Sequence, residues 1–322
     1  MNLTIGYTMM CEQAGPRQLV QDVVAAEEAG FAFAVISDHY SPWLDAQGHS
    51  PYAWSVLGAA AWATERIGLM TYVTAPVKRY HPAVVAQKAA TVQLLAQGRF
   101  TLGLGSGENL NEHVTGGGWP PANIRHEQLR EAVEIIRELW QGDYVSYRGT
   151  HFQVDSAKIW DLPDVLPDLG IAVSGKQSCT LAGELADVMV AVEPKPELGK
   201  WFDAAGGTGK PRVGQLPVSF DRNRDTAIER AHEQFRWFGG GWKVNAELPG
   251  PPAFDAASKF VRPEDVAETI PCGADPEAIA KALQPFADAG FTHVALVQVG
   301  GDAQRPFIDF AEKELLAAVR EA

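Results

Sequence analysis

Short apolar runs alternate along the chain with longer stretches in which apolar residues recur every three or four positions. The apolar runs predict eight β-strands, at residues 3–7, 32–37, 67–74, 100–104, 170–173, 188–192, 213–218 and 293–299. The longer stretches predict helices at residues 16–29, 53–64, 83–96, 127–140, 177–185, 226–238 and 276–289. Runs such as FAFAVIS and THVALVQV are apolar at nearly every position, which is typical of parallel strands buried on both faces.

This alternation predicts an α/β protein with a (β/α)8 TIM barrel. A doubly wound open sheet is the alternative, but polar residues follow many different strands instead of gathering at one switch point. We predict a single domain over residues 1–322, with inserted loops at the C-terminal face near residues 144–167 and 239–271. The first insertion contains YRGTHFQVD, which predicts a β-hairpin. The second is rich in glycine and proline, which fits a substrate-facing loop and equally a passive surface excursion.

Composition narrows the class of protein further. Hydrophobic residues make up 46% of the 322 residues and charged residues 21%, as in an ordinary globular enzyme. The net charge of −13 argues against a nucleic-acid partner, because phosphate backbones require a basic surface. No apolar run is long enough to span a bilayer and the N-terminus does not resemble a secretory signal, so we expect a cytoplasmic protein without a membrane partner.

The second predicted strand ends in Ser37-Asp38-His39, at the position where barrel strands present residues to the active-site mouth. Histidine at such a place is a candidate general acid or base, because its ordinary pKa lies near neutrality. Asp38 is a candidate to orient the imidazole or to contact a cofactor. A structural histidine in a hydrogen-bonded strand end is the alternative, although the aromatic Trp43 nearby favours a functional site.

The fourth strand leads into LGLGSGENLNE, residues 102–112. Its glycines do not have the spacing of a dinucleotide fingerprint. We interpret them, Gly107 included, as positions that let a flat ligand approach the backbone closely. Glu108 follows at once and is a candidate proton donor or acceptor for a bound ring, with Asn111 one helical turn further on. A helix cap in a tight turn is the alternative.

Two further strand ends carry features suited to an anion. Lys78 and Arg79 follow the third strand, where a basic pair suits an anionic cofactor tail as well as it suits a solvated surface. Ser174, Gly175 and Lys176 precede a helix, whose N-terminal N–H groups bind phosphate in many proteins. A short turn without a ligand fits the same pattern.

The chemistry must come from an organic cofactor. The sequence contains no H-E-x-x-H, P-loop or G-x-S-x-G motif, and its cysteines, Cys11, Cys179 and Cys272, have no metal-ligand spacing. We therefore predict no metal site. A candidate base and a candidate carboxylic acid remain, which are the groups that a redox cofactor needs for proton transfer.

Taken together, these stretches resemble the luciferase-like family of flavin and deazaflavin barrel enzymes, and within it the coenzyme F420-dependent glucose-6-phosphate dehydrogenase group. The likeness covers nearly the whole chain. It is carried by IGY to EQ at residues 5–13, SDHYSPW at 37–43, LMTYVTAP at 69–76, YHPAVVAQ at 80–87 and LGLGSGENLNE at 102–112.

The resemblance implies a role for each matching residue. His39 matches the base that takes the proton of the substrate hydroxyl, and Glu108 matches the acid that protonates the reduced ring. Trp43 matches an aromatic residue that shields the reacting centre, and Glu12 a substrate-side acid. The positions that hold the deazaflavin correspond to Asp38, Val73, Thr74, Gly107, Asn111, Ser174 and Gly175. The family also implies a cis non-prolyl peptide near Tyr72-Val73.

The likeness is weakest where that group binds phosphate. Lys195 matches one phosphate-binding lysine, and Lys243 matches a second in a stretch that aligns poorly. Thr269 falls where an arginine is expected, and Glu193 places a carboxylate nearby. We assign Lys195, Lys243 and Glu193 to the substrate side, and we expect glucose 6-phosphate to be a poor substrate because a carboxylate repels phosphate.

The predicted function is therefore F420-dependent hydride transfer between C5 of the deazaflavin and an alcohol or hemiacetal, or a reducible small molecule. Two alternatives stay open: a sugar-phosphate dehydrogenase proper, and an FMN-dependent monooxygenase of the same family. The predicted partner is a small-molecule substrate. The resemblance also implies a homodimer.

Overall fold

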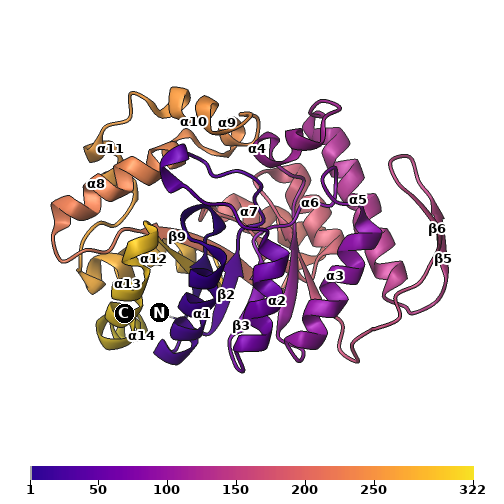
Figure 1. Cartoon of the computed structure of the whole chain (residues 1–322), viewed down its shortest axis with the longest axis horizontal. Helices are drawn as coiled ribbons and strands as arrows, with labels where there is room; N and C mark the ends of the chain where they lie inside the picture. Colours follow the sequence, from indigo (N-terminus) through magenta and orange to yellow (C-terminus); the bar gives the residue numbers. More distant parts are fainter. Residues whose placement is uncertain (1) are drawn as a thin grey trace.

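The apolar runs form parallel strands that close on themselves in the order β1-β10-β9-β8-β7-β4-β3-β2. The computed structural model describes residues 2–322. Its barrel strands are β1 (Thr4–Met9), β2 (Phe33–Ile36), β3 (Gly68–Thr71), β4 (Phe100–Leu104), β7 (Asp168–Ala172), β8 (Val188–Val190), β9 (Arg212–Val218) and β10 (His293–Gln298). This closed barrel with flanking helices confirms the (β/α)8 prediction and excludes the open sheet (Figure 1).

Helices surround the barrel, and several of them begin at a proline, whose missing N–H costs nothing in a first turn (Figure 1). Those that pack outside the strands or follow them are α1 (Pro16–Ala29), α2 (Ala53–Ala63), α3 (Pro82–Leu95), α4 (Asn109–Glu112), α5 (Ala122–Leu139), α6 (Lys176–Leu185), α7 (Pro196–Phe202), α8 (Arg224–Phe235), α12 (Pro276–Asp288), α13 (Gln304–Phe310) and α14 (Leu316–Glu321). Predicted helices and strands thus form near their predicted bounds.

The strands are apolar at successive positions because each of their two faces packs against a different layer. In β2, Val35 points into the barrel and packs with Met70 and Val190, whereas Ala34 and Ile36 pack in the outer layer under the helices. A barrel filled in this way is a solid core rather than a pore. A ligand site is therefore confined to the ends of the strands.

The two insertions differ in position. The first forms the predicted hairpin, β5 (Val145–Arg148) and β6 (Gln153–Ala157), which projects beside α5 (Figure 1). The α5 carboxylate of Glu131 accepts three hydrogen bonds from backbone N–H groups between the two hairpin strands, at 2.8–3.1 Å. The second forms α9 (Trp242–Asn245), α10 (Pro251–Ser258) and α11 (Pro263–Thr269), which lie with α8 over one end of the barrel (Figure 1).

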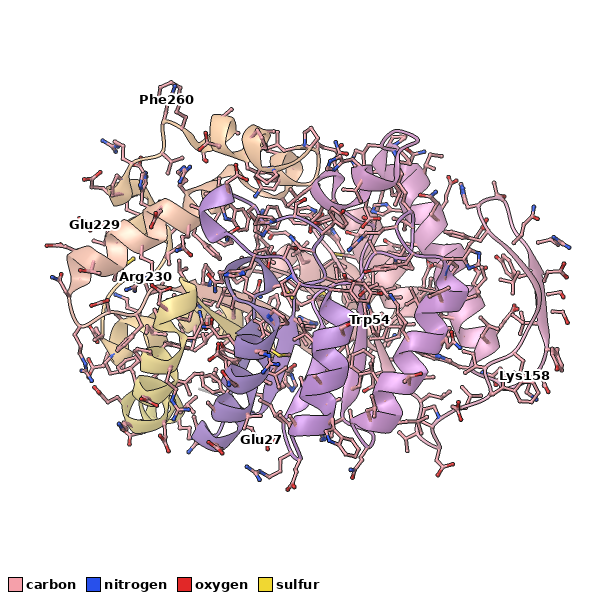
Figure 2. All side chains as sticks on the ribbon, viewed as in Figure 1. Glu27, Trp54, Lys158, Glu229, Arg230 and Phe260 are labelled. Carbon is pink, nitrogen blue, oxygen red and sulfur yellow. The ribbon has the colours of Figure 1, made fainter. Side chains whose placement is uncertain are left out.

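At the opposite end of the barrel, hydrogen bonds tie α1 to the segment that precedes β3. The Glu27 carboxylate accepts hydrogen bonds from the backbone N–H groups of Glu65, Arg66 and Ile67, just before β3. Figure 2 shows Glu27 at the end of the molecule opposite Phe260, which lies between α10 and α11 and is 88% exposed. No helix within residues 2–322 has the length and apolar character needed to cross a membrane.

Candidate active site

A cavity of about 370 Å³ lies where the C-terminal ends of the strands meet the second insertion. Residues that follow β1, β2, β3, β4, β7 and β8 line it together with several residues of the segment 235–245, among them Phe235, Trp237, Phe238 and Trp242. The first insertion contributes none of its residues within 144–167 to this lining. The predicted site residues that do line the cavity are Glu12, Asp38, His39, Trp43, Val73, Gly107, Glu108, Asn111, Ser174 and Glu193.

His39 stands between two carboxylates in this cavity. Its Nδ1 lies 2.8 Å from Glu12 Oε1, and its Nε2 lies 3.6 Å from Glu108 Oε2. All three side chains are largely buried, with 8%, 1% and 15% exposure for His39, Glu12 and Glu108. Because Nδ1 forms the ion pair with Glu12, Nε2 is the nitrogen that is left for proton exchange in the cavity, and its nearest carboxylate is that of Glu108.

The carboxylate of Glu12 is positioned by a second hydrogen bond, on the oxygen that does not contact His39. The Ser37 hydroxyl donates to Glu12 Oε2 at 2.5 Å, and it accepts a hydrogen bond from the Cys11 N–H at 3.0 Å. Glu12 lies in a short 3-10 turn, Cys11–Gln13, directly after β1, and Ser37 directly after β2. Pairing of these two neighbouring strands therefore places a serine, a glutamate and a histidine in one hydrogen-bonded row.

The loop that carries His39 is fixed by two side-chain amides. Asn111 on α4 accepts a hydrogen bond from the Tyr40 N–H at 2.8 Å, and its amide nitrogen lies 3.3 Å from Glu108 Oε2 as a donor. The Gln47 side chain accepts from the Trp43 N–H at 2.8 Å. Asn111 thus ties the strand-2 loop to the strand-4 loop, with the imidazole of His39 3.6 Å from Glu108.

These contacts set the protonation of the site. Burial by itself lowers the pKa of His39, but the charges of Glu12 and Glu108 outweigh it and raise the pKa to about 9. Burial raises the pKa of Glu108 to about 7, against the opposing charge of His39. Burial also disfavours the Glu12 carboxylate, yet the charge and hydrogen bond of His39 hold the pKa of Glu12 below its usual value. Glu12 and His39 therefore form a buried ion pair near neutral pH.

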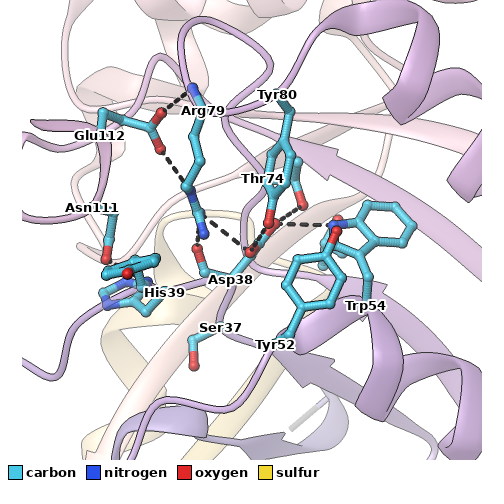
Figure 3. Close-up of polar contacts among 12 residues, drawn as sticks. Ser37, Asp38, His39, Tyr52, Trp54, Thr74, Arg79, Tyr80, Asn111 and Glu112 are labelled. Carbon is cyan, nitrogen blue, oxygen red and sulfur yellow. Dashed lines mark hydrogen bonds and ion pairs between the residues drawn. The ribbon is translucent and has the colours of Figure 1, made fainter. Parts of the chain in front are cut away.

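Asp38 has a different role from its neighbour. Its Oδ2 accepts hydrogen bonds from Thr74 Oγ1 at 2.7 Å and from Trp54 Nε1 at 3.0 Å (Figure 3). Its Oδ1 accepts from the Tyr80 hydroxyl at 3.0 Å and from Arg79 at 3.2 Å. The carboxylate is thus satisfied by protein donors. Thr74, predicted to hold the cofactor, is fully buried and reaches Asp38 rather than the cavity.

The basic pair after β3 also turns away from a ligand. Arg79 donates to the Asp38 carbonyl oxygen at 2.6 Å and lies between Asp38 and Glu112, whose Oε2 accepts from the Arg79 N–H at 2.8 Å (Figure 3). Lys78 donates to the carbonyl oxygen of Gly118. The interpretation of this pair as a grip for an anionic tail therefore finds no support in the geometry.

Packing explains part of the glycine-rich turn. A Cβ on Gly103 would lie 2.0 Å from the Thr71 carbonyl oxygen, and one on Gly105 would lie 2.6 Å from Val73 Cγ2. Gly107 has a positive φ of 82°, which other residues rarely adopt. Gly105 and Gly107 line the cavity, but Gly103 does not. Gly103 and Gly105 therefore allow β4 and the residues after it to pack closely against Thr71 and Val73, in addition to any approach of a ligand.

The predicted cis peptide is present between Tyr72 and Val73, and Val73 lines the cavity. Ser174 lines it as well, whereas Gly175 lies just outside the lining, as the residue before α6. The Ser178 hydroxyl accepts the N–H groups of Ser174 and Gly175, at 3.1 and 3.2 Å. The N–H groups left for an anion are therefore those of the first turn of α6.

The three predicted substrate residues do not converge on the cavity. Glu193 lines the cavity, but Lys195 and Lys243 are exposed and do not line it. Lys195 Nζ instead forms an ion pair with Glu193 Oε2 at 2.8 Å. Thr269, at the position where an arginine was expected, does line the cavity.

Sequence reasoning missed an aromatic wall supplied by the end of α8, the turn Arg236–Gly240 and the start of the second insertion. The rings of Trp43 and Trp237 stack with centroids 4.0 Å apart and an interplanar angle of 10°. The ring of His39 lies 4.9 Å from that of Trp43. Phe235, Phe238 and Trp242 also line the cavity, as do Thr8, Gln215 and His126. The density of aromatic residues over 235–242 was the signal available in the sequence.

Comparison with known proteins identifies the family of this chain. The family described as luciferase-like monooxygenase matches residues 4–293. The F420-dependent glucose-6-phosphate dehydrogenase of Nocardia farcinica is 34% identical over 99% of this chain and 98% of its own length. That of Beutenbergia cavernae is 35% identical over the same shares, 99% and 98%.

A solved structure is similar over the full length. It is an F420-dependent secondary alcohol dehydrogenase in complex with an F420–acetone adduct, with a TM-score of 0.89 and 28% identity over 99% of this chain and 100% of that chain. The barrel, the placement of the strand-end residues and these matches lead to one assignment. The chain belongs to the luciferase-like monooxygenase family.

Proposed function

We propose that the chain is a coenzyme F420-dependent oxidoreductase that transfers a hydride between the cofactor and the carbon of an alcohol or carbonyl group. The proposal is supported by relatives named as F420-dependent dehydrogenases, which match it over nearly their whole length. The observation that carries it is the position of His39 between Glu12 and Glu108 in a cavity at the strand ends. Hydride transfer needs such a positioned acid–base pair.

The residues present fit this cofactor. A Cβ on Gly175 would meet no atom within 4 Å, so space is open at the start of the ten-residue helix α6. The N-terminus of a helix favours an anion, and it would receive the phosphate of the cofactor. Val73, Gly107 and Ser174 would then border the ring system from three strand ends.

When bound, F420 would supply the hydride chemistry, taking a hydride from an alcohol C–H bond or returning one to a carbonyl carbon. His39 Nε2 would hold the proton that leaves or joins the substrate oxygen. Glu108 would hold the proton exchanged with the cofactor ring. Glu12 orients the imidazole through Nδ1, and Trp43 covers its ring and keeps water away.

The protonation of the free protein matches the reductive direction. With pKa values of about 9 for His39 and about 7 for Glu108, His39 carries a proton and Glu108 is ionised between these limits. In that state His39 could protonate a carbonyl oxygen, and Glu108 could accept a proton from the bound cofactor. We infer that reduction of a carbonyl compound uses the populated state, whereas alcohol oxidation uses a minor state with the proton moved from His39 to Glu108.

Titration with F420 tests the cofactor. Binding at micromolar or lower concentration, followed by the change in cofactor fluorescence, is the expected result. Parallel titration with FMN tests the monooxygenase alternative. Tight binding of FMN without binding of F420 would contradict the proposal.

The homodimer and the cytoplasmic location stay predictions. Sedimentation equilibrium of the purified chain distinguishes a dimer from a monomer. Fractionation of the source cells tests the location.

A further inference from the structure

The cavity contains no basic side chain suited to a phosphate. Within residues 2–322, none of its lining residues is a lysine or an arginine. Acidic residues line it instead: Glu12, Glu108 and Glu193, together with Asp38 and Glu112, whose carboxylates accept hydrogen bonds from Arg79. Arg79, the nearest buried guanidinium in this network, is held between Asp38 and Glu112 and does not line the cavity. A phosphate dianion would therefore enter a site whose positive charges already have partners.

The residues at the expected phosphate-binding positions, Lys195 and Thr269, also offer no free positive charge. Lys195 is 56% exposed and pairs with Glu193, so that the two formal charges cancel at the rim. The hydroxyl of Thr269 donates to the Val266 carbonyl oxygen at 3.0 Å. Threonine also lacks the bidentate grip of an arginine.

The wall opposite these groups is aromatic. Trp237 lies in the turn Arg236–Gly240, stacks on Trp43 and lines the cavity. Its indole N–H donates to the Gln234 carbonyl oxygen at 3.1 Å, so its polar atom is satisfied within the protein. Phe254 packs edge-on against Trp43 at 5.0 Å and supports the stack from the second insertion. A substrate carbon held beside His39 therefore meets flat apolar rings.

We propose that the substrate is an uncharged apolar alcohol or its ketone, preferably one bearing a ring, and that Trp237 is the residue that selects it. This inference rests on the proposed function, because it concerns the same cavity and the same hydride transfer. The ring of the substrate packs against the Trp43–Trp237 stack, and the hydroxyl or carbonyl oxygen lies toward His39 Nε2. Sugar phosphates are excluded by the carboxylates and by the absence of lysine and arginine from the lining, since the positive charge of His39 is already paired with Glu12.

Ligand binding to the F420-loaded protein tests the proposal independently of turnover. Calorimetric titrations compare cyclohexanone, acetophenone, acetone, glucose and glucose 6-phosphate. The ring-bearing ketones should bind about tenfold more tightly than acetone, as expected for one aromatic contact. Glucose 6-phosphate should bind at least about a hundredfold more weakly than they do. Tighter binding of glucose 6-phosphate, or no binding of the uncharged ketones, overturns the proposal.

Trp237→Leu tests the selecting residue. It should raise the KM for cyclohexanone about tenfold more than it raises the KM for acetone. Trp62→Leu is the matched control, because Trp62 lies on α2 and is 81% exposed. Trp237→Phe, which keeps a ring, should retain most of the preference and serves also if the leucine variant does not fold. An equal loss for both ketones contradicts a selecting role.

The double variant Glu193→Gln with Thr269→Arg tests the exclusion of phosphate. Removing one carboxylate, which also frees Lys195, and adding a guanidinium at the rim should raise kcat/KM for glucose 6-phosphate by at least about tenfold. Glu197→Gln on α7 is exposed and does not line the cavity, and as the control it should have no effect. An unchanged kcat/KM in the double variant overturns the electrostatic explanation.

Failure of this inference is distinguishable from failure of the proposed function. Binding of F420 together with a preference for glucose 6-phosphate would retain the function and overturn the substrate class. Absence of F420 binding would overturn the function itself. A preference for cationic amines over ketones of the same size would also overturn the substrate class.

Discussion

Asp38 and His39 are adjacent in the chain, yet they belong to two networks with opposite properties. The Asp38 carboxylate accepts four side-chain hydrogen bonds from outside the cavity and has no contact that a substrate would change (Figure 3). His39 lies between two carboxylates in the cavity, and its pKa is raised to about 9 by them against the effect of burial. The difference shows that a charged residue at a barrel strand end is structural when protein donors satisfy it, and reactive when its partners are themselves titratable.

The largest effect is expected from breaking the His39 network. His39→Asn should lower kcat by about 10²–10⁴-fold, because the proton on the substrate oxygen then has no positioned acceptor or donor. Glu108→Gln should lower kcat by at least about tenfold. Steady-state kinetics measure both, and F420 titration should show unchanged cofactor affinity. Full activity in both variants would assign the two residues to structure instead.

Breaking the Asp38 network should instead reduce stability. Asp38→Asn leaves the buried Arg79 without its full countercharge, and we expect a loss of about 3–5 kcal/mol in the free energy of unfolding. Urea denaturation followed by circular dichroism measures this loss. Asp45→Asn is the control, because Asp45 is exposed in a short 3-10 turn and should change little. A stable Asp38→Asn variant that fails only to bind F420 would restore Asp38 as a cofactor ligand.

The dependence of activity on pH tests the titratable partners of His39. The dependence of kcat/KM on pH should be bell-shaped, with limbs near the pKa values of about 7 for Glu108 and about 9 for His39. Glu108→Gln should remove the acid limb. Glu12→Gln should move the alkaline limb to lower pH, because burial then lowers the pKa of His39 with less opposing charge. An alkaline limb that stays near pH 9 in Glu12→Gln would rule out this origin.

The smallest effect is expected at Ser37. Ser37→Ala removes one hydrogen bond to Glu12, which keeps its ion pair with His39, so kcat should fall by less than about tenfold. Ser55→Ala, at an exposed position of α2, is the control. A loss in kcat as large as that of His39→Asn would mean that Ser37 takes part in proton transfer directly.

From the sequence, both the barrel and the reactive role of His39 could be predicted, but the structural role of Asp38 could not. Alternation of apolar runs and helical stretches is local, and it located strands such as Phe100–Leu104 and helices such as Pro16–Ala29 at their observed bounds. The resemblance pointed to His39 and Glu108, which the structure places 3.6 Å apart. The resemblance could not show that the hydrogen-bonding capacity of the Asp38 carboxylate is already satisfied. The donors to this carboxylate come from residues 16 to 42 positions away in the chain.

The amino-acid sequence by itself determined the class of fold and the strand ends at which reactive side chains appear, since both follow from patterns that extend over one strand and one helix. Only the tertiary structure decided which charges remain available to a ligand. Lys195 is neutralised by Glu193, and Trp237 comes from the distant turn after α8 to stack on Trp43. Charge pairing and ring stacking depend on distances of a few ångströms between segments far apart in the chain, and those distances exist only once the barrel has closed.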